Sequence, residues 1–277
     1  MMYSAEISRS NPSCFLFMID QSGSMSDPFG ASTKAESVAD AINRLLQNLI
    51  IKCAKSEGIR DYYHVGVIGY GASVGPAFGG VLAGKELVPI SEIADHPSRL
   101  EKRLKKIPDG AGGVVDQLVK FPVWLDPVAS GGTPICQAMD TAHTILSQWV
   151  SEYAHCFPPV VIHITDGEST DGDPTPAMEQ IRALATDDGN ILLFNLHISS
   201  NPNAVNLSFP ETSDELPDRY SRMLYESSSI LTPFMIWVAN QEHQLNLSDR
   251  ARGFVLNADL TLVVQALDIG TRPANLR

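Results

Sequence analysis

Two apolar runs that each end on a carboxylate place the strongest constraint on the fold. Residues 15–19 are all apolar and lead into Asp20, and residues 160–164, apolar except for one histidine, lead into Thr165 and Asp166. Short uninterrupted apolar runs are typical of strands covered on both faces, as in the parallel sheets of α/β proteins. Ligands of such sheets bind at the carboxyl ends of the strands, where both carboxylates are expected. The pattern predicts a doubly wound, mostly parallel α/β sheet with helices on both faces.

Oxygen-bearing side chains follow the first run at every second position. These residues are Asp20, Ser22 and Ser24, and Gly23 between the serines allows a tight turn. A set of oxygen ligands without nitrogen or sulfur suits a hard divalent cation, Mg²⁺ rather than Zn²⁺. Asp, Ser and Gly are also common turn and capping residues after a strand, so this segment alone leaves the ordinary structural interpretation open.

Two further segments complete the set. Thr133 lies in a Ser-Gly-Gly-Thr-Pro sequence directly before a strongly helical pattern, and Asp166 lies in a Thr-Asp-Gly sequence. Together with the Asp-x-Ser-x-Ser pattern, and in this order, they resemble the von Willebrand factor A domain over residues 13–269. The resemblance implies a Rossmann-like fold with a metal-ion-dependent adhesion site. The residues at its five ligand positions are Asp20, Ser22, Ser24, Thr133 and Asp166.

The same resemblance implies metal-dependent protein binding and no catalysed reaction. In the family the serines bind the metal directly, the threonine binds it directly or through water, and the aspartates often act through water. Mg²⁺ is the expected ion, with Mn²⁺ or Ca²⁺ as alternatives, and an Asp or Glu of a partner protein completes its coordination. Bacterial intracellular members occur beside kinases and phosphatases, which implies a part in a signalling, stress or conflict system.

Two other functions stay open at this point. A metal-dependent phosphohydrolase would use Asp20 as its nucleophile, but such enzymes carry Asp-x-Asp and the second acidic position here is Ser22. An RNA-associated scaffold would need clustered basic side chains, whereas the formal net charge is −12. Turnover of an aryl phosphate tests the first alternative, and salt-sensitive retention of RNA tests the second.

Cysteine usage and hydropathy indicate the compartment. The four cysteines form no Cys-x-x-Cys pair and lie in or beside apolar stretches, so buried free thiols are expected. Residues 1–13 lack a signal-peptide pattern, and no apolar run approaches the ~20 residues that span a bilayer. A cytoplasmic protein without membrane or nucleic-acid partners is therefore expected, whose oligomeric state the sequence does not indicate.

The chain alternates between helical and strand patterns without a linker or repeat, which predicts a single domain over residues 1–277 with five or six strands. Elaborations of its core are expected at residues 71–117 and 199–240. A capping box at residues 33–36 predicts a helix that runs to residue 53. Further helices are expected at 135–150, 176–186, 216–224 and 259–267, and further strands at 64–70, 86–90, 190–198 and 253–256. The type of the apolar segment at 232–238 is not determined by its pattern.

One stretch of this acidic chain is basic. Residues 97–106 predict a helix, whose surface is either an ordinary solvated face or a docking patch for an acidic partner. Its basic residues are Arg99, Lys102, Arg103, Lys105 and Lys106.

Several other polar residues have ordinary structural interpretations. His163 and His197 lie in central-strand patterns and are expected to be hydrogen-bonded core histidines. Glu168, Asp171 and Asp173 follow the second apolar run, where turn formation and helix capping are expected. A second cation site is the alternative for these acidic residues.

Overall fold

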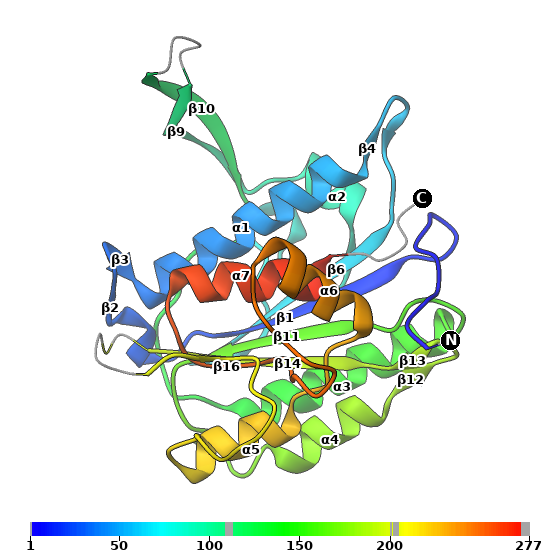
Figure 1. Ribbon diagram of the computed structural model, residues 1–277. Coiled ribbons are helices and arrows are strands. Elements are labelled where there is room, and N and C mark those ends of the chain that lie inside the picture. The colour runs from blue at the N-terminus through cyan, green and yellow to red at the C-terminus, as the bar shows by residue number, and fades with distance from the viewer. Residues whose placement is uncertain (1, 109–112, 200, 202–204, 273–277) are drawn as a thin grey trace.

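A mostly parallel eight-stranded sheet forms the centre of the molecule (Figure 1). The structure is a computed structural model and describes residues 2–108, 113–199, 201 and 205–272. The sheet order is β15-β16-β14-β11-β1-β6-β7, with β8 also paired to β6. Its parallel strands are β1 (Ser13–Asp20), β6 (Tyr63–Tyr70), β11 (Val160–Thr165), β14 (Leu192–Ile198) and β16 (Phe254–Ala258).

Strand β1 lies between β11 and β6, and every one of its residues is buried. Its side chains alternate between two cores. Phe15, Phe17 and Ile19 join one, and Leu16 and Met18 join the other. Burial on both faces explains why the run is apolar throughout, and it confirms the expected doubly wound α/β sheet.

Helices cover both faces of the sheet (Figure 1). One core is shared with α1 (Lys34–Cys53), α2 (Ile90–Asp95), α6 (Pro233–Glu242) and α7 (Leu260–Thr271). The other is shared with α3 (Ile135–Glu152), α4 (Thr175–Ala183) and α5 (Arg219–Ser227). The apolar segment of undetermined type is thus the start of helix α6.

Short edge strands, hairpins and 3-10 helices surround this core. The edge strands β7 (Val74–Pro76), β8 (Val88–Pro89) and β15 (Leu207–Ser208) pair antiparallel and raise the strand number above the expected five or six. Small hairpins pair β2 (Pro28–Phe29) with β3 (Ser32–Thr33), β4 (Ala54–Lys55) with β5 (Gly58–Ile59), and β12 (Ala185–Thr186) with β13 (Gly189–Asn190). The 3-10 helices are η1 (Gly23–Ser26) and η2 (Gly80–Leu82).

Helix α1 begins with the capping box that the sequence predicts. The Thr33 hydroxyl accepts from the Glu36 amide at 3.2 Å, and the Glu36 carboxylate accepts from the Thr33 amide at 2.9 Å. These two bonds satisfy backbone donors that the first helical turn leaves free. They also fix the first helical residue, Lys34, which lies at the candidate site described below.

The expected helix over residues 97–106 is wrong. This segment forms β9 (Arg99–Pro108), which pairs antiparallel with β10 (Val114–Val123) in a separate two-stranded arm. The arm projects from the body beyond α1 (Figure 1). Its Leu, Glu, Lys and Arg residues are good helix formers, but pairing with a strand that contains Val and Phe overrides this local preference.

The cysteines are free thiols, as expected, and three of the four are buried. Within the described residues, no helix combines the length and the apolar character needed to cross a membrane.

His163 is a hydrogen-bonded core histidine, as expected from the sequence. Its Nε2 lies 2.7 Å from the Tyr70 hydroxyl, and its Nδ1 lies 2.8 Å from the side-chain oxygen Oδ1 of Asn195. The side-chain nitrogen Nδ2 of Asn195 donates to the Leu224 carbonyl, which fixes the orientation of the side-chain amide. His163 Nδ1 must therefore be the donor to Asn195, and Nε2 accepts from Tyr70 in a neutral imidazole.

This neutral histidine makes stability depend on pH. Burial lowers the pKa of His163 to about 4, against the opposing effect of its hydrogen bond with Asn195. In the unfolded chain the imidazole titrates near a pKa of about 6.5, so below that pH the unfolded state binds a proton that the folded state does not. We expect this residue to remove about 2 kcal/mol of unfolding free energy between pH 7 and pH 5 in urea titrations.

The His163→Gln variant is the control for this expectation. It should be less stable than the parent protein at pH 7, because the buried network is disturbed, yet it should lose less stability on acidification. An equal loss in both proteins would assign the pH dependence to other groups.

Candidate metal site

Asp20 ends strand β1 and is fully buried. Its Oδ1 accepts from the Ser22 amide at 2.8 Å, and its Oδ2 accepts from the Thr165 hydroxyl at 2.9 Å. Burial raises the pKa of Asp20, and the hydrogen bonds from Ser22 oppose that rise. The carboxylate thus turns the following loop and ties it to the neighbouring strand β11.

A chain of hydroxyl groups continues from this turn. The oxygens of Ser22 and Ser24 are 3.0 Å apart, and the Ser24 hydroxyl donates to Asp166 Oδ1 at 2.8 Å. Strands β1 and β11 are adjacent and parallel, which brings Asp20 and Asp166 to the same edge of the sheet. Four of the five residues predicted from the sequence therefore form one polar cluster.

The loop that contains Thr133 packs directly against the first loop. The Ser130 amide donates to the Gln21 carbonyl at 2.6 Å, and the Gly23 amide donates to the Gly131 carbonyl at 3.0 Å. Gly131 has a φ of +84°, and a Cβ there would lie 2.4 Å from the Ala72 nitrogen. Only glycine fits this close approach of backbones.

Thr133 is buried and tied to the loop after β11. Its amide donates to the Thr170 hydroxyl at 3.0 Å, and its carbonyl accepts from the Thr170 amide at 2.9 Å. Among the residues that the structure describes, the Thr133 hydroxyl has no hydrogen-bond partner. The backbone is thus fixed while the side-chain oxygen is available to a ligand.

Two of the acidic residues after β11, Asp171 and Asp173, cap helices. Asp171 accepts from the amides of Cys136 and Gln137 at 3.0 and 2.9 Å, and Asp173 accepts from the Thr175 amide at 3.0 Å. Asp173 caps α4, but Asp171 caps α3, which is not the helix expected from the sequence. The positive end of α3, beside Thr133, is therefore already matched by a carboxylate of the chain.

Lys34 joins the cluster and was not identified from the sequence as a site residue. Its Nζ lies 2.8 Å from Asp166 Oδ2 and 3.2 Å from Asp27 Oδ2. The side chain is 6% exposed, that of Asp166 is 0% exposed and that of Asp27 is 54% exposed. A lysine in the first turn of a helix opposes the helix dipole, and this was the one sequence signal of a local partner.

Further residues brace the Asp166 loop from strand β14 and helix α5. The Tyr220 hydroxyl donates to the Gly167 carbonyl. His197 pairs in register with Thr165, and its ring meets that of Tyr220 edge-on with centroids 6.4 Å apart. Burial lowers the pKa of His197, and the nearby Asp166 carboxylate opposes this shift. His197 was also expected to be a core histidine, but it is only half-buried, unlike His163.

The oxygens of the cluster fit a small hard cation. Adjacent ligands of an octahedral ion with bonds of about 2.1 Å lie about 3 Å apart, whereas around Ca²⁺ the separation is about 3.4 Å. The Ser22–Ser24 and Ser24–Asp166 oxygen pairs are hydrogen-bonded at 3.0 and 2.8 Å, and this hydrogen-bond spacing is close to that of adjacent Mg²⁺ ligands. In the described part of the chain, no group of three or more His, Cys, Asp or Glu side chains is placed to hold a metal. A metal here would therefore depend on hydroxyl ligands.

Fold and cluster together define an α/β protein with an oxygen-lined site at the carboxyl ends of adjacent strands. No family model matches the sequence, and no curated protein matches it. Solved structures similar to it include von Willebrand factor type A from Catenulispora acidiphila, with 15% identity over 68% of this chain and a TM-score of 0.41. Another is manganese-loaded Plasmodium vivax TRAP protein, with 13% identity over 97% and a TM-score of 0.42.

A third similar structure is the pilus adhesin SpaC from Lactobacillus rhamnosus GG, with 15% identity over 96% of this chain and a TM-score of 0.47. The chain spans 34% of the Catenulispora structure, 76% of TRAP and 31% of SpaC.

Proposed function

We propose that this chain is a von Willebrand factor A-type module that binds a partner protein through Mg²⁺ or Mn²⁺. The proposal rests on one observation, the cluster of hydroxyl and carboxylate oxygens in which Ser24 touches both Ser22 and Asp166. The ion would be held by Asp20, Ser22, Ser24, Thr133 and Asp166. When bound, it would supply an open coordination position for an Asp or Glu of the partner.

The chain's own residues would then have separate tasks. Asp20 holds the Ser22 amide and so orients the serine hydroxyls, while Thr165 keeps the Asp20 carboxylate in place. Thr133, whose backbone is fixed but whose hydroxyl has no partner among the described residues, would respond to the ion and to its ligand.

The charges of the site favour an acidic partner. Asp20 and Asp166 are the only acidic residues among the five proposed ligands, so the ligands do not exceed the charge of a divalent ion. The Lys34 ammonium lies between Asp166 and Asp27, at 2.8 and 3.2 Å, and offsets the charge of these two carboxylates. An ion without surplus negative ligands would attract a carboxylate of the partner, because attraction between charges is stronger in a partly buried site than in water.

The geometry argues against the phosphohydrolase alternative. A nucleophilic carboxylate must reach the phosphorus atom of its substrate, yet Asp20 is fully buried and both of its oxygens accept hydrogen bonds. We therefore propose binding without catalysis. The cytoplasmic location and the part in signalling, stress or conflict remain predictions from sequence, and the net charge of −12 still disfavours the RNA-associated alternative.

Thermal unfolding with EDTA, Mg²⁺, Mn²⁺ or Ca²⁺ tests the metal site. A ligand present at about 100 times its Kd, and bound only by the folded state, stabilises it by about 2.7 kcal/mol, which raises Tm by about 5 °C in a protein of this size. We expect such a rise with Mg²⁺ and Mn²⁺ and a smaller one with Ca²⁺ at equal concentration. A Tm that no cation moves would contradict the metal-binding part of the proposal.

A further inference from the structure

The two-stranded arm is the part of the molecule that the proposed function does not use. Strands β9 and β10 each contain ten residues and pair only with each other among the described strands. An isolated pair of strands is at best marginally stable in water. The arm therefore needs either a strong attachment at its base or a partner along its length. Its inner face is attached to the body, and its outer face is exposed.

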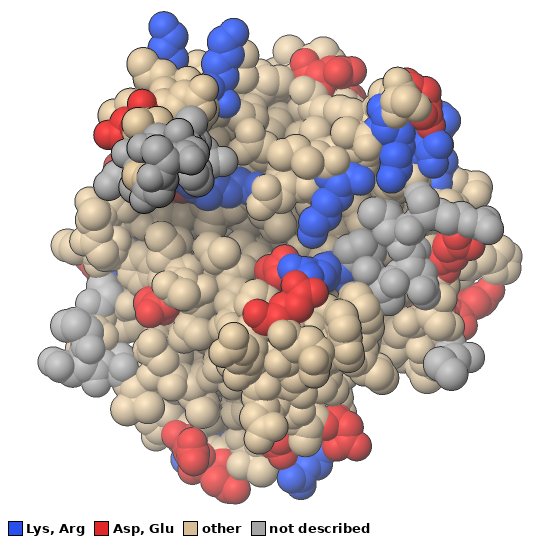
Figure 2. Space-filling model, turned by 45° about the horizontal axis from the view of Figure 1, so that its top comes forward, with Lys and Arg blue, Asp and Glu red and all other residues tan. Residues whose placement is uncertain are grey.

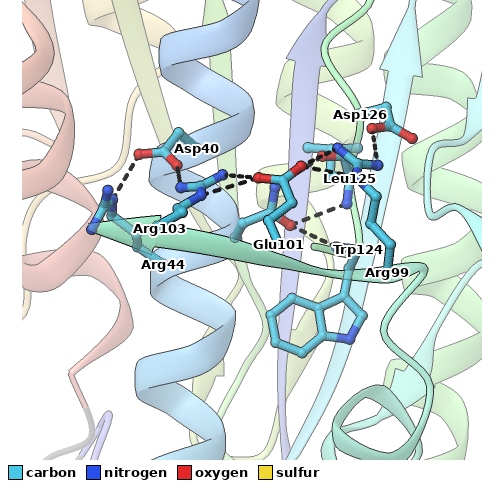
Figure 3. Close-up of polar contacts among 9 residues, drawn as sticks. Asp40, Arg44, Arg99, Glu101, Arg103, Trp124, Leu125 and Asp126 are labelled. Carbon is cyan, nitrogen blue, oxygen red and sulfur yellow. Dashed lines mark hydrogen bonds and ion pairs between the residues drawn. The ribbon is translucent and has the colours of Figure 1, made fainter. Parts of the chain in front are cut away.

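The inner face of the arm is attached to helix α1 through a chain of ion pairs (Figure 3). Asp40 of α1 pairs with both Arg44 and Arg103, and Arg103 also contacts Glu101 at 2.9 Å. Glu101 in turn pairs with Arg99 at 2.6 Å. Both arginines of the arm are thus neutralised within the chain and are not free to bind a partner.

The base of the arm is fixed by backbone contacts as well (Figure 3). Asn43 of α1 is buried, and its side-chain oxygen accepts from the amides of Trp124 and Leu125 at 2.8 and 3.1 Å. The Trp124 indole donates to the Ile93 carbonyl at 2.6 Å, and the Arg103 guanidinium lies 3.7 Å from the centre of the Phe121 ring. The arm consequently leaves the body in a defined direction.

The outer face of the arm is mainly apolar and basic, and its one acidic residue among those described is Asp116, opposite Lys106 near the tip. The register pairs Leu104 with Leu118 and Lys102 with Lys120, and it places Leu100 on the same face two residues before Lys102. The three leucines are 57%, 69% and 64% exposed in chain order. Large apolar side chains that gather on one exposed face are typical of interaction surfaces. The side chains of Lys105 and Lys106 lie outside the described part of the structure.

The lysine pair indicates the charge of the partner. Lys102 and Lys120 are directly opposite one another and exposed, and neither has an ion pair within the described residues. Like charges at opposed positions of two strands destabilise the pairing. An anionic partner would remove this repulsion, whereas the same face of a second copy would bring two more lysines against it.

The net charge supports the same conclusion. Figure 2 shows basic side chains at the upper left with acidic ones beside them, and further basic and acidic side chains over the centre and the right of the visible face. With a net charge of −12, the body repels acidic proteins, so an acidic segment would be drawn to the arm.

We propose that the outer face of the arm docks an extended acidic segment of another protein. Its apolar side chains would cover Leu100, Leu104 and Leu118, and its carboxylates would pair with Lys102 and Lys120. This contact requires no metal ion and is independent of the site at Asp20.

A model peptide tests the proposal with the full chain. The probe is a fluorescein-labelled peptide in which leucine and glutamate alternate along one side and serine and threonine along the other. Its binding is measured by fluorescence anisotropy in EDTA. We expect saturable, salt-sensitive binding, weakened about tenfold or more by the double variant Lys102→Glu/Lys120→Glu. The double variant Leu104→Ser/Leu118→Ser should weaken it to a similar extent.

The matched control is Lys52→Glu/Lys55→Glu, which changes the net charge equally at exposed lysines outside the arm. It should bind the probe almost as the parent protein does, and circular dichroism with thermal unfolding verifies that each variant folds. Several outcomes would overturn the proposal: no probe binding, equal binding of a peptide with lysine in place of glutamate, or no loss in the arm variants. Self-association through the arm, or retention of single-stranded RNA or phosphatidylglycerol vesicles in preference to the probe, would also overturn it.

Discussion

Replacing Lys34 with methionine should destabilise the metal-free protein by about 3 kcal/mol. The Lys34 ammonium is buried against Asp166, whose side chain is 0% exposed, at 2.8 Å. Removing one partner of such a pair leaves the other charge in a poorly solvated place, which is far more damaging than losing an exposed ion pair. The second contact, to the half-exposed Asp27, adds little because solvent screens it.

The same replacement should strengthen the binding of Mg²⁺. In the parent protein Lys34 already places a positive charge on Asp166, one of the proposed ligands, and this charge repels an incoming cation. We expect the Lys34→Met variant to bind Mg²⁺ at least about tenfold more tightly, which corresponds to about 1.4 kcal/mol. Stability and metal affinity should therefore change in opposite directions, so the variant would become strongly dependent on metal for folding.

Urea unfolding in EDTA and calorimetric titration with Mg²⁺ measure the two effects separately. Lys52→Met, at an exposed lysine near the other end of the same helix, is the matched control and should change neither quantity appreciably. A Lys34→Met protein with parental stability in EDTA would show that the ion pair does not support the fold. Unchanged Mg²⁺ affinity would show that Lys34 does not regulate the site.

The centre of the fold was accessible from sequence because local and tertiary preferences agree there. The run that ends on Asp20 is apolar at every position, and such a strand is stable only when covered on both faces. The capping box at Thr33 and Glu36 is likewise a local motif whose bonds form within one turn. The neighbouring placement of Asp20 and Asp166 follows from the rule for ligand sites in parallel sheets.

The parts that sequence reasoning missed depend on contacts between distant residues. Arg99 to Lys106 favours a helix locally, and only pairing with residues 116–123, which lie 10 to 24 positions later, makes it β9. Lys34 could be assigned to a helix start, but its ion pair joins it to a residue 132 positions later. Asp171 caps α3 rather than the next helix for the same reason, since the loop after β11 folds back over Thr133.

Replacing Asp20 with asparagine should abolish the Mg²⁺-dependent rise in Tm while leaving the metal-free fold intact. An asparagine oxygen can still accept from the Ser22 amide, and its side-chain nitrogen can donate to the Thr165 hydroxyl, whose single proton can then be donated to the Gly167 carbonyl at 3.0 Å. Burial disfavours the charge of Asp20, so removing that charge should not destabilise the metal-free protein by more than about 1 kcal/mol. The free energy of unfolding in EDTA should therefore equal or exceed that of the parent protein within this margin. The variant should lose the stabilisation of about 2.7 kcal/mol expected near metal saturation.

A comparison with Asp20→Ala separates the two tasks of this carboxylate. Alanine leaves the buried Ser22 amide without its acceptor, so this variant should be about 2 kcal/mol less stable than the parent protein even in EDTA. Asparagine should therefore remove the metal response alone, and alanine should remove the metal response together with the order of the loop. If the asparagine variant kept the full Mg²⁺-dependent rise in Tm, Asp20 would be a structural residue and the metal would have to be held without its charge.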